Sequence, residues 1–374
     1  MSKVTVVSCE TYDPAKVREA LIKALEPLGG LDFIKQGMRI GIKANLVTVK
    51  SVDSAATTNP VMLAELCRLI CERGAHPVVG DSPGGPFALP YLKTVYAAAG
   101  LSAVESAGGE LNTDMSEITA PFPEGRVLKS VTYTGWLRNC DAVITFAKLK
   151  SHGMLGMTAA VKNQFGIIPG ITKAEFHSLY PKAEDFCGMM IDLNEFIKPR
   201  LAIIDAVIGM EGNGPTAGTP RKIGCILASD SVYHADVAAA HIIGRGKELP
   251  LLAEAAKYGL APEDISGLDI VGDLDAFRVP DFKNIDIGGV PFGGREDSFL
   301  MRTMRNVLAR RPQADKTKCV GCGLCAKKCP QGAITIKKYP KFNVQSCIRC
   351  FCCQEFCPKE AISVKTTLAS KILG

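Results

Sequence analysis

The sequence lacks the features of several common classes of protein. No apolar run approaches the roughly 18 residues that would span a bilayer, and residues 1–9 contain no charged segment followed by an apolar core. We therefore expect a cytoplasmic protein with no membrane partner and no signal peptide. Aromatic residues form only 6% of the chain and are not interleaved with basic residues. This composition argues against a nucleic-acid partner.

Motifs for nucleotide binding and for a nucleophilic serine are also missing. No G-x-G-x-x-G sequence follows a predicted strand, and no G-x-x-x-x-G-K-[ST] sequence occurs, so neither a dinucleotide site nor a P-loop is indicated. No Ser, His and Asp arrangement with a nucleophile elbow is found either.

The sequence does contain enough apolar residues for a large folded protein, and many cysteines. The chain has 374 residues, of which 47% are hydrophobic and 22% charged, so its length indicates two or three domains with substantial cores. It also has 15 cysteines. In a cytoplasmic protein this number indicates metal or redox chemistry, whereas in a secreted protein it would indicate disulfides.

Strand and helix patterns alternate through residues 1–311. Apolar, β-branched runs predict strands at residues 4–8, 39–47, 76–80, 142–146, 201–204, 224–228 and 268–271. Helical patterns occur at residues 13–28, 60–73, 89–99, 234–244, 251–257 and 296–310. The first helix has Asp13 as its N-cap and Pro14 at its first position. This alternation predicts an α/β domain at 1–311, with an open, mostly parallel sheet and helices on both faces.

Residues 312–374 contain two cysteine runs of identical spacing. The first run is Cys319-x2-Cys322-x2-Cys325-x3-Cys329-Pro330, and the second is Cys347-x2-Cys350-x2-Cys353-x3-Cys357-Pro358. The short spacing lets the first three thiolates of a run surround one cubane from a single loop. A zinc site usually takes four ligands from two CxxC pairs, so zinc fits this pattern poorly, as do disulfides.

The two runs resemble those of the bacterial two-cluster ferredoxins, in which the fourth cysteine of each run binds the other cluster. This resemblance implies two [4Fe-4S] clusters in a small α+β ferredoxin-like domain at 312–374. The implied ligands of cluster one are Cys319, Cys322, Cys325 and Cys357. The implied ligands of cluster two are Cys347, Cys350, Cys353 and Cys329. Apolar segments at 333–336 and 361–364 fit the two related strands of such a domain.

Seven cysteines lie outside these two sets. Cys352, next to Cys353, is either a thiol packed against the cluster loop or an alternative ligand, and the packed thiol is the favoured interpretation. Cys67 and Cys71 lie four residues apart on a predicted helix with no second pair nearby, which favours small buried side chains over a metal site. The same interpretation applies to Cys9, Cys140, Cys187 and Cys225.

Positive charge is concentrated in the cysteine-rich segment. Residues 315–374 carry 11 Lys and Arg against three Asp and Glu, whereas the other 314 residues carry 33 against 35. Two four-thiolate clusters would add about four negative charges and leave the segment basic. The excess either favours an acidic electron carrier, such as a ferredoxin or flavodoxin, or only keeps a small domain soluble.

Polar and glycine-rich segments follow several predicted strands of the α/β domain. Ligands of open α/β sheets bind beyond the carboxyl ends of the strands, so these segments predict a cleft there. Lysines and free backbone N–H groups suit a small anionic substrate with a carboxylate or phosphate. Candidate substrate-binding residues are Lys43, Asn45, Gly84, Gly85, Lys148, Lys150, Lys162 and Asn163. Candidate catalytic proton donors are His152, His177, Asp205 and Glu211.

Five segments follow one another along the α/β domain: Lys43-Ala-Asn45, Lys148-Leu-Lys-Ser-His152, Val161-Lys-Asn-Gln-Phe-Gly166, His177 and Met210-Glu-Gly-Asn-Gly-Pro215. Their order resembles an uncharacterised family, domain of unknown function 362 (DUF362). The resemblance covers roughly residues 1–290, and members of that family often carry a C-terminal two-cluster ferredoxin domain. It implies an α/β domain with a polar cleft and no particular reaction.

Three functional hypotheses follow. The leading one is an oxidoreductase that passes electrons from an acidic carrier through the clusters to a small anionic substrate in the cleft. The second is a non-enzymatic electron-transfer or maturation protein whose α/β domain docks a partner. The third is a redox sensor in which loss of a cluster changes partner binding. A pocket with lysine and carboxylate side chains beside a cluster would favour the first hypothesis.

Overall fold

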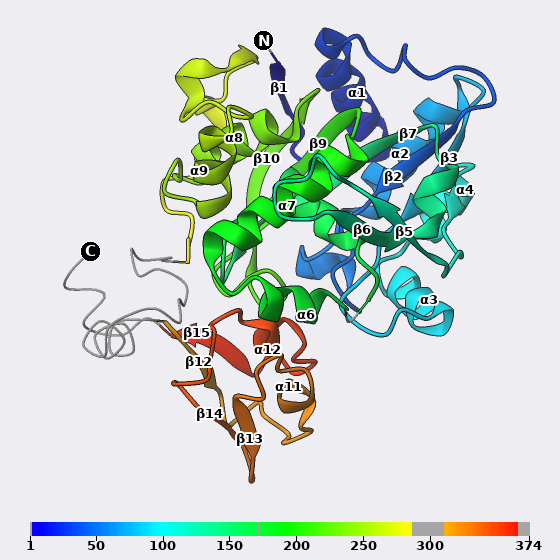
Figure 1. Ribbon diagram of the computed structural model, residues 1–374. Helices are drawn as coiled ribbons and strands as arrows, with labels where there is room; N and C mark the ends of the chain where they lie inside the picture. Colours follow the sequence, from blue (N-terminus) through cyan, green and yellow to red (C-terminus); the bar gives the residue numbers. More distant parts are fainter. Residues whose placement is uncertain (1, 171, 286–309, 366–374) are drawn as a thin grey trace.

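The computed structural model describes residues 2–170, 172–285 and 310–365 (Figure 1). The predicted helix at 296–310 lies almost entirely outside these residues. Figure 1 shows a large sheet with helices around it and, beneath it, a small lobe formed by the cysteine-rich segment. We call the described residues 310–365 the C-terminal lobe. The predicted domain boundary after residue 311 remains a prediction.

The large sheet has nine strands in the order β11-β1-β10-β9-β7-β2-β3-β4, and β8 pairs with β7 outside this path. Five strand pairs are parallel, while β10 runs antiparallel to both of its neighbours and β8 antiparallel to β7. The predicted mostly parallel sheet is therefore confirmed. The strands are β1 (Lys3–Ser8), β2 (Arg39–Lys43), β3 (His76–Gly80), β4 (Glu110–Leu111), β7 (Ala142–His152), β8 (Gly156–Thr158), β9 (Leu201–Glu211), β10 (Thr219–Ser229) and β11 (Asp269–Val271).

Helices cover both faces of this sheet, as predicted. Alternate residues of β7 enter different cores: Ile144 and Phe146 belong to one, and Val143 and Ala147 to the other. The first core also takes side chains from α1 (Pro14–Leu25), α2 (Pro60–Cys71), α3 (Leu89–Ala98) and α4 (Ser102–Ser106). The second takes them from α5 (Ala160–Asn163), α7 (Ala183–Ile197), α8 (Val232–Ile242) and α9 (Pro250–Lys257).

Local capping explains where the first two helices begin. The Asp13 carboxylate accepts a hydrogen bond from the backbone N–H of Lys16 at 3.1 Å, and Pro14 occupies the first turn, as the sequence predicts. Asn59 caps α2 in the same way, through Val61 N–H at 2.9 Å.

The described residues of the α/β part also contain six short 3₁₀ segments: Glu26–Leu28, Val52–Ser54, Gly135–Asn139, Gln164–Ile167, Ile265–Gly267 and Asp275–Phe277.

Several central strands are longer than the sequence predicts. The run predicted at 142–146 extends to His152, and the run predicted at 201–204 extends to Glu211. Charged residues such as Lys148 and Asp205 interrupt the apolar pattern, but they lie on adjacent strands and form an ion pair, so the strands continue through them. The strand predicted at 39–47 ends instead at Lys43.

The C-terminal lobe contains two small antiparallel pairs and two short helices. The strands predicted at 333–336 and 361–364 appear as β13 (Ile334–Ile336) and β15 (Ile362–Lys365). They pair with β14 (Pro340–Phe342) and β12 (Arg311–Ala314), which the sequence did not predict. The helices are α11 (Leu324–Lys327) and α12 (Cys352–Glu355).

Two further elements lie between the sheet strands in sequence. A hairpin of β5 (Glu117–Pro121) and β6 (Ser130–Thr134) packs Tyr133 into the second core. Helix α6 (Thr172–Leu179) lies next to the C-terminal lobe, where Gln331 donates a hydrogen bond to Ser178 Oγ at 2.7 Å. In the described part of the chain, no helix combines the length and apolar character required to cross a membrane.

Candidate functional site

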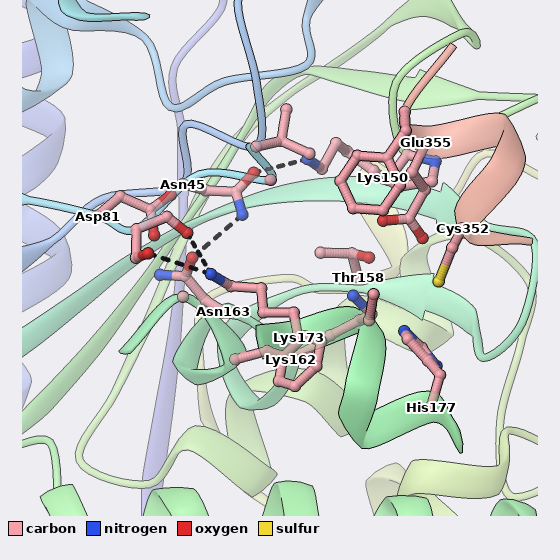
Figure 2. Close-up of a pocket in the computed structure, with 18 residues that line it drawn as sticks. Asn45, Asp81, Lys150, Thr158, Lys162, Asn163, Lys173, His177, Cys352 and Glu355 are labelled. Atoms are coloured by element: carbon pink, nitrogen blue, oxygen red, sulfur yellow. Dashed lines mark hydrogen bonds between the residues drawn. The ribbon is translucent and has the colours of Figure 1, made fainter. Parts of the chain in front are cut away.

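A pocket of about 700 Å³, partly open to solvent, lies between the α/β sheet and the C-terminal lobe (Figure 2). Asn45, Asp81 and Ser82 enter it from the carboxyl ends of β2 and β3, where ligands of open α/β sheets are expected. Helix α12 supplies Cys352 and Glu355. The remaining lining residues are Val47, Gly84, Lys150, Thr158, Lys162, Asn163, Phe165, Gly166, Lys173, Ala174, His177, Pro215 and Phe356.

Lys43 lies beneath this pocket and does not line it. Its Nζ forms an ion pair with Asp81 Oδ1 at 2.7 Å and donates to the carbonyl of Ala44 at 2.7 Å. Burial lowers the pKa of Lys43, and the Asp81 carboxylate acts in the opposite direction. Residue 166 has to be glycine here, because a Cβ would lie 2.0 Å from Asp81 Oδ1. The pair shapes the floor of the pocket.

Lys148 and Asp205 form a second buried pair outside the pocket. Lys148 Nζ lies 2.9 Å from Asp205 Oδ2 and donates to the Tyr12 hydroxyl at 2.8 Å, and that hydroxyl donates to Asp205 Oδ1 at 2.9 Å. Asp205 lies inside β9, whereas the sequence placed it at a strand end. Neither side chain lines the pocket, and both are buried. Asp205 Oδ2 also accepts a hydrogen bond from the backbone N–H of Asn59 at 3.1 Å.

Lys150 is the buried lysine of β7 that does reach the pocket. Its Nζ donates to Asn45 Oδ1 at 2.6 Å and to the carbonyl of Ala56 at 2.8 Å. No carboxylate among the described residues forms an ion pair with it. Burial, reinforced by the positive charge of Lys162, lowers the pKa of Lys150 to about 7. This amine therefore changes charge near neutral pH.

Lys173 of α6 is a pocket lysine that sequence reasoning missed. Its Nζ donates to the Ser82 carbonyl at 2.6 Å and to the Ile168 carbonyl at 2.5 Å. Removal from water lowers the pKa of Lys173 to about 7, against the opposing effect of Asp81. Lys173 follows no predicted strand, so the strand-end rule that found other pocket residues could not find it.

Lys162 and Thr158 point into the same part of the pocket (Figure 2). Lys162 Nζ lies 5.6 Å from the centre of the Phe165 ring, a cation–π distance. The Thr158 hydroxyl is buried and has no hydrogen-bond partner among the described residues. A free hydroxyl beside an ammonium group is a suitable pair of donors for an oxyanion.

His177 lines the pocket as a neutral imidazole. Its ring stacks on Phe186 with centroids 4.5 Å apart and planes at 14°. Burial lowers the pKa of His177 to about 3, so the ring carries no charge at neutral pH. Its Nδ1 has no hydrogen-bond partner in the described part of the chain. His177 can therefore form a hydrogen bond with a ligand, but it is a poor source of protons.

His152 does not line the pocket and instead faces Glu355. Its Nδ1 accepts from the backbone N–H groups of Met154 and Leu155, at 3.0 and 3.1 Å, which assigns the proton to Nε2. That nitrogen lies 3.3 Å from Glu355 Oε1. Burial lowers the pKa of His152 to about 4, so the neutral ring orients the Glu355 carboxylate.

Glu355 is the acidic side chain that α12 brings to the pocket. Burial acts to raise its pKa, but the hydrogen bond from His152 and the charge of Lys162 outweigh this effect and lower it to about 2. The sequence did not identify Glu355, because only the docking of the lobe brings it to the α/β residues. The pocket keeps a basic balance, since Asp81 is paired with Lys43 and three lysines remain.

The remaining predicted residues have different positions. Asn163 and Gly84 line the pocket, and Asn163 Oδ1 accepts from Asn45 Nδ2 at 3.1 Å. Gly85 does not line it and packs against Tyr91. Glu211 also lies elsewhere, where its carboxylate accepts a hydrogen bond from the backbone N–H of Lys283 at 3.0 Å.

Two cavities in the C-terminal lobe are lined by four cysteines each. One, of about 370 Å³, is lined by Cys319, Cys322, Cys325 and Cys357. The other, of about 340 Å³, is lined by Cys329, Cys347, Cys350 and Cys353. We call them the first and the second cysteine cavity. Among the described residues, no three His, Cys, Asp or Glu side chains are placed to hold a single metal ion. The thiols surround a space, and four thiolates around a space are the donor set of a [4Fe-4S] cubane.

Related hydrogen bonds support both cavities. The backbone N–H of Ala333 donates to Cys329 Sγ at 3.3 Å, and that of Ala361 donates to Cys357 Sγ at 3.3 Å. Such bonds to cluster thiolates tune reduction potentials. Cys352, adjacent to Cys353, lines the pocket between the sheet and the lobe and neither cysteine cavity.

Comparisons with known proteins agree with this architecture. Residues 312–335 match the 4Fe-4S binding domain, so the chain carries a domain of the iron–sulfur electron-transfer class. Residues 40–241 match the domain of unknown function DUF362. The chain is also 33% identical, over 274 residues, to the thylakoid-associated protein sll1697 of Synechocystis, a match that covers 70% of this chain and 81% of that protein. The chain belongs to the DUF362 family.

Solved structures resemble the chain only in part. The lactate racemase apoprotein of Thermoanaerobacterium thermosaccharolyticum has 13% identity and a TM-score of 0.37, over 59% of this chain and 54% of the racemase. A structural genomics protein from Thermotoga maritima has 16% identity and a TM-score of 0.34, over 57% of this chain and 55% of its own. The chain thus spans about half the length of these proteins, and the scores are too low to assign a shared fold.

Proposed function

We propose that the protein is an oxidoreductase that reduces a small anionic substrate in the lysine-lined pocket, with electrons delivered through two [4Fe-4S] clusters. The position of α12 carries this proposal. Cys352 and Glu355 of α12 line the pocket, while the adjacent residues Cys353 and Cys357 line the second and the first cysteine cavity. The short segment 352–357, which begins with α12, therefore borders the pocket and both cysteine cavities.

The eight cysteines of the two cavities are the proposed cluster ligands. Each cavity collects three cysteines from one run and the fourth from the other, in the pattern of two-cluster ferredoxins. When bound, each cluster would accept and pass on one electron at a time. We assign the α/β domain to residues 1–311 and the cluster domain to 312–374, and we expect the protein in the cytoplasm.

The pocket residues suit an anion with a carboxylate or phosphate group. Lys162 and the free Thr158 hydroxyl would donate to one oxyanion, and Lys150 lies on the same surface of the pocket. Asn45 holds Lys150 in place through its side-chain oxygen. His177 would supply a neutral hydrogen-bond partner. Among the candidate proton donors from the sequence, only His177 lines the pocket.

The protons come from the two lysines with pKa values near neutrality. A two-electron reduction consumes two electrons and two protons, and the donor of each proton needs a pKa close to the working pH. Lys150 and Lys173 meet this requirement, because the pKa of each is about 7. Each neutral amine would regain its proton from solvent through the open side of the pocket. Asp205 and Glu211 take no part in this scheme.

Sulfate provides a test of the anion site because it is a dianion without a substrate's reactivity. We expect sulfate to bind the anaerobically reconstituted protein and to change the electron paramagnetic resonance spectrum of the reduced clusters. Lys162→Gln should weaken sulfate binding about tenfold, since it removes one charged donor. Lys93→Gln, an exposed lysine on α3, is the matched control. The proposal fails if sulfate leaves the spectrum unchanged and Lys162→Gln binds it as well as the wild type.

Iron and sulfide content test the two-cluster assignment. The reconstituted protein should contain about eight iron and eight sulfide per chain, four of each per cubane. Cys353→Ala should lower both numbers, because Cys353 lines the second cysteine cavity. Cys352→Ala should leave them unchanged, because Cys352 faces the substrate pocket. Equal losses of iron and sulfide in Cys353→Ala and Cys352→Ala would contradict the assignment of the cluster ligands.

A further inference from the structure

The two cysteine cavities differ in their access to solvent. In the first, Cys322 is exposed and Cys325 is buried, and the neighbouring Val320 is 63% exposed. In the second, none of the four cysteines is exposed, and Cys350 and Cys353 are buried. Phe351, which lines the second cavity, is 2% exposed and belongs to the core of the α/β sheet. An external protein can therefore approach the first cavity more closely than the second.

In the docked lobe, most acidic side chains face the α/β part, whereas most lysines are exposed to solvent. The segment has three acids, and two of them face the α/β part: Glu355 lies against His152, and Glu360 forms an ion pair with Lys50. Asp315, the third acid, is exposed, and no basic side chain among the described residues forms an ion pair with it. The exposed lysines of the lobe are Lys316, Lys318, Lys327, Lys337, Lys338, Lys341, Lys359 and Lys365. The outer surface is thus more basic than the segment as a whole.

Three of these lysines belong to segments that adjoin the exposed loop of the first cavity. Lys318 directly precedes Cys319, the first cysteine of the run. The carbonyl of Lys338 lies 2.9 Å from the position that a Cβ on Gly321 would occupy. The turn between β13 and β14, which contains Lys338, therefore packs against the loop of the first cavity. Lys359 lines the first cavity together with Val320 and Cys322. We call Lys318, Val320, Cys322, Lys338 and Lys359 the entry surface.

We propose that the entry surface docks an acidic one-electron carrier protein and that electrons enter the molecule through the cluster of the first cysteine cavity. This proposal rests on the two-cluster function above and adds the place and partner of electron entry. An apolar centre with a charged rim is the usual composition of a transient docking surface. Basic side chains around it attract an acidic partner over a distance.

The electron balance fixes how the carrier is used. Each carrier molecule binds in its reduced form, gives one electron to the first cluster and leaves in its oxidised form. A two-electron reduction in the pocket therefore needs two encounters with reduced carrier. Binding through charged rims is weak and sensitive to salt, so the oxidised carrier can leave rapidly and a reduced one can take its place. The protons are supplied at the pocket, so the entry surface needs no titrating group.

Flavodoxin, an acidic flavoprotein, is a suitable probe. In the variant Lys318→Glu/Lys338→Glu/Lys359→Glu, the affinity for oxidised flavodoxin, measured by titration calorimetry at low ionic strength, should fall about tenfold or more. The rate of cluster bleaching by flavodoxin hydroquinone in a stopped-flow instrument should fall by a similar factor. Bleaching by reduced methyl viologen, a small cationic reductant, should not slow. Wild-type binding should weaken steeply with added salt.

The matched control is Lys16→Glu/Lys35→Glu/Lys93→Glu, which makes the same change in net charge on exposed positions of the α/β part. We expect it to bind flavodoxin nearly as well as the wild type. Equal losses in the two triple variants, or no loss in either, would overturn the entry surface while leaving the clusters and the pocket in place. Wild-type protein without iron and sulfide would instead overturn the two-cluster function itself, and the two failures are thereby distinguished.

Discussion

The three buried lysines of the sheet differ in what compensates their charge. Lys43 and Lys148 each face a carboxylate, at 2.7 and 2.9 Å. Lys150 has only neutral acceptors, the oxygens of Asn45 and Ala56. An uncompensated ammonium inside a protein is unstable relative to the neutral amine. Lys150 is therefore the sheet lysine whose charge a bound anion would restore, and this property separates a binding lysine from a structural one.

Sulfate binding should depend on pH through Lys150. Its pKa of about 7 lies below the ordinary lysine value, so the side chain is charged below pH 7 and neutral above it. Sulfate stays a dianion throughout this range. We expect its affinity, measured by titration calorimetry, to fall about tenfold between pH 6 and pH 8. Lys173 changes charge in the same range and acts in the same direction.

Lys150→Gln provides the comparison for this titration. The amide keeps polar contact with its neighbours but carries no charge, so sulfate affinity should be lower at pH 6 and the pH dependence should be reduced. Lys93→Gln should reproduce the wild-type profile. A wild-type affinity that stays constant from pH 6 to pH 8 would show that the pocket lysines do not titrate there.

Among the elements, the loop after β9 holds the C-terminal lobe. The sequence offered Glu211, where this loop begins, as a catalytic proton donor, whereas the structure shows Asn213 of the loop in contact with the lobe. Its Oδ1 accepts from Gln354 Nε2 at 2.6 Å, and its Nδ2 donates to the carbonyl of Ile362 at 3.2 Å. Pro215 alone from this segment lines the pocket. The loop thus joins α12 and β15 to the large sheet.

Asn213→Ala should loosen the lobe without unfolding the sheet. It removes the acceptor and donor described above and leaves Gln354 with fewer hydrogen-bond partners. The free energy that holds the lobe against the α/β part should fall by about 1–3 kcal/mol. We expect faster amide hydrogen exchange in β15 and α12, measured by mass spectrometry, and unchanged exchange in β2 and β7. Gln331→Ala, which removes an exposed contact to Ser178, should change exchange in β15 little. Equal exchange in Asn213→Ala and the wild type would refute this role.

For the whole molecule, the pocket is complete only when the lobe is seated, because both parts of the chain line it. Residues of the α/β part form most of the wall, and Cys352, Glu355 and Phe356 of the lobe supply the rest. The lobe itself has a small core, with Cys325, Ile334, Cys353 and Ile362 as its buried members. Small domains of this kind depend on their metal for stability. Cluster binding and completion of the pocket should therefore be coupled.

Iron removal tests this coupling. After chelation of the iron under anaerobic conditions, amide exchange should rise across the lobe and in α6, and sulfate affinity should fall because Glu355 and its neighbours no longer hold the pocket closed. The central strands β7 and β9 should keep their protection. Unchanged sulfate affinity in the iron-free protein would mean that the α/β part forms the anion site alone.

Features that depend on short-range order follow from the amino-acid sequence. The spacing within each run brings its first three cysteines to one cavity, whereas the exchange of Cys329 and Cys357 between the runs was implied by the resemblance to two-cluster ferredoxins. Alternating apolar runs likewise determined the α/β class, and capping residues such as Asp13 set the start of a helix. The residues after β2 and β3 were found because strand ends meet at one edge of a sheet.

Which charged residues reach the pocket depends on packing between segments that are distant in the sequence. Lys148 and Lys150 are two residues apart, yet one is neutralised by Asp205 and the other faces the pocket, because Asp205 is adjacent on a neighbouring strand. Glu355 and Lys173 reach the site through the docking of α12 and α6 from distant parts of the chain. Charge, burial and pKa depend on neighbours in space, and these neighbours are set by packing over the whole molecule.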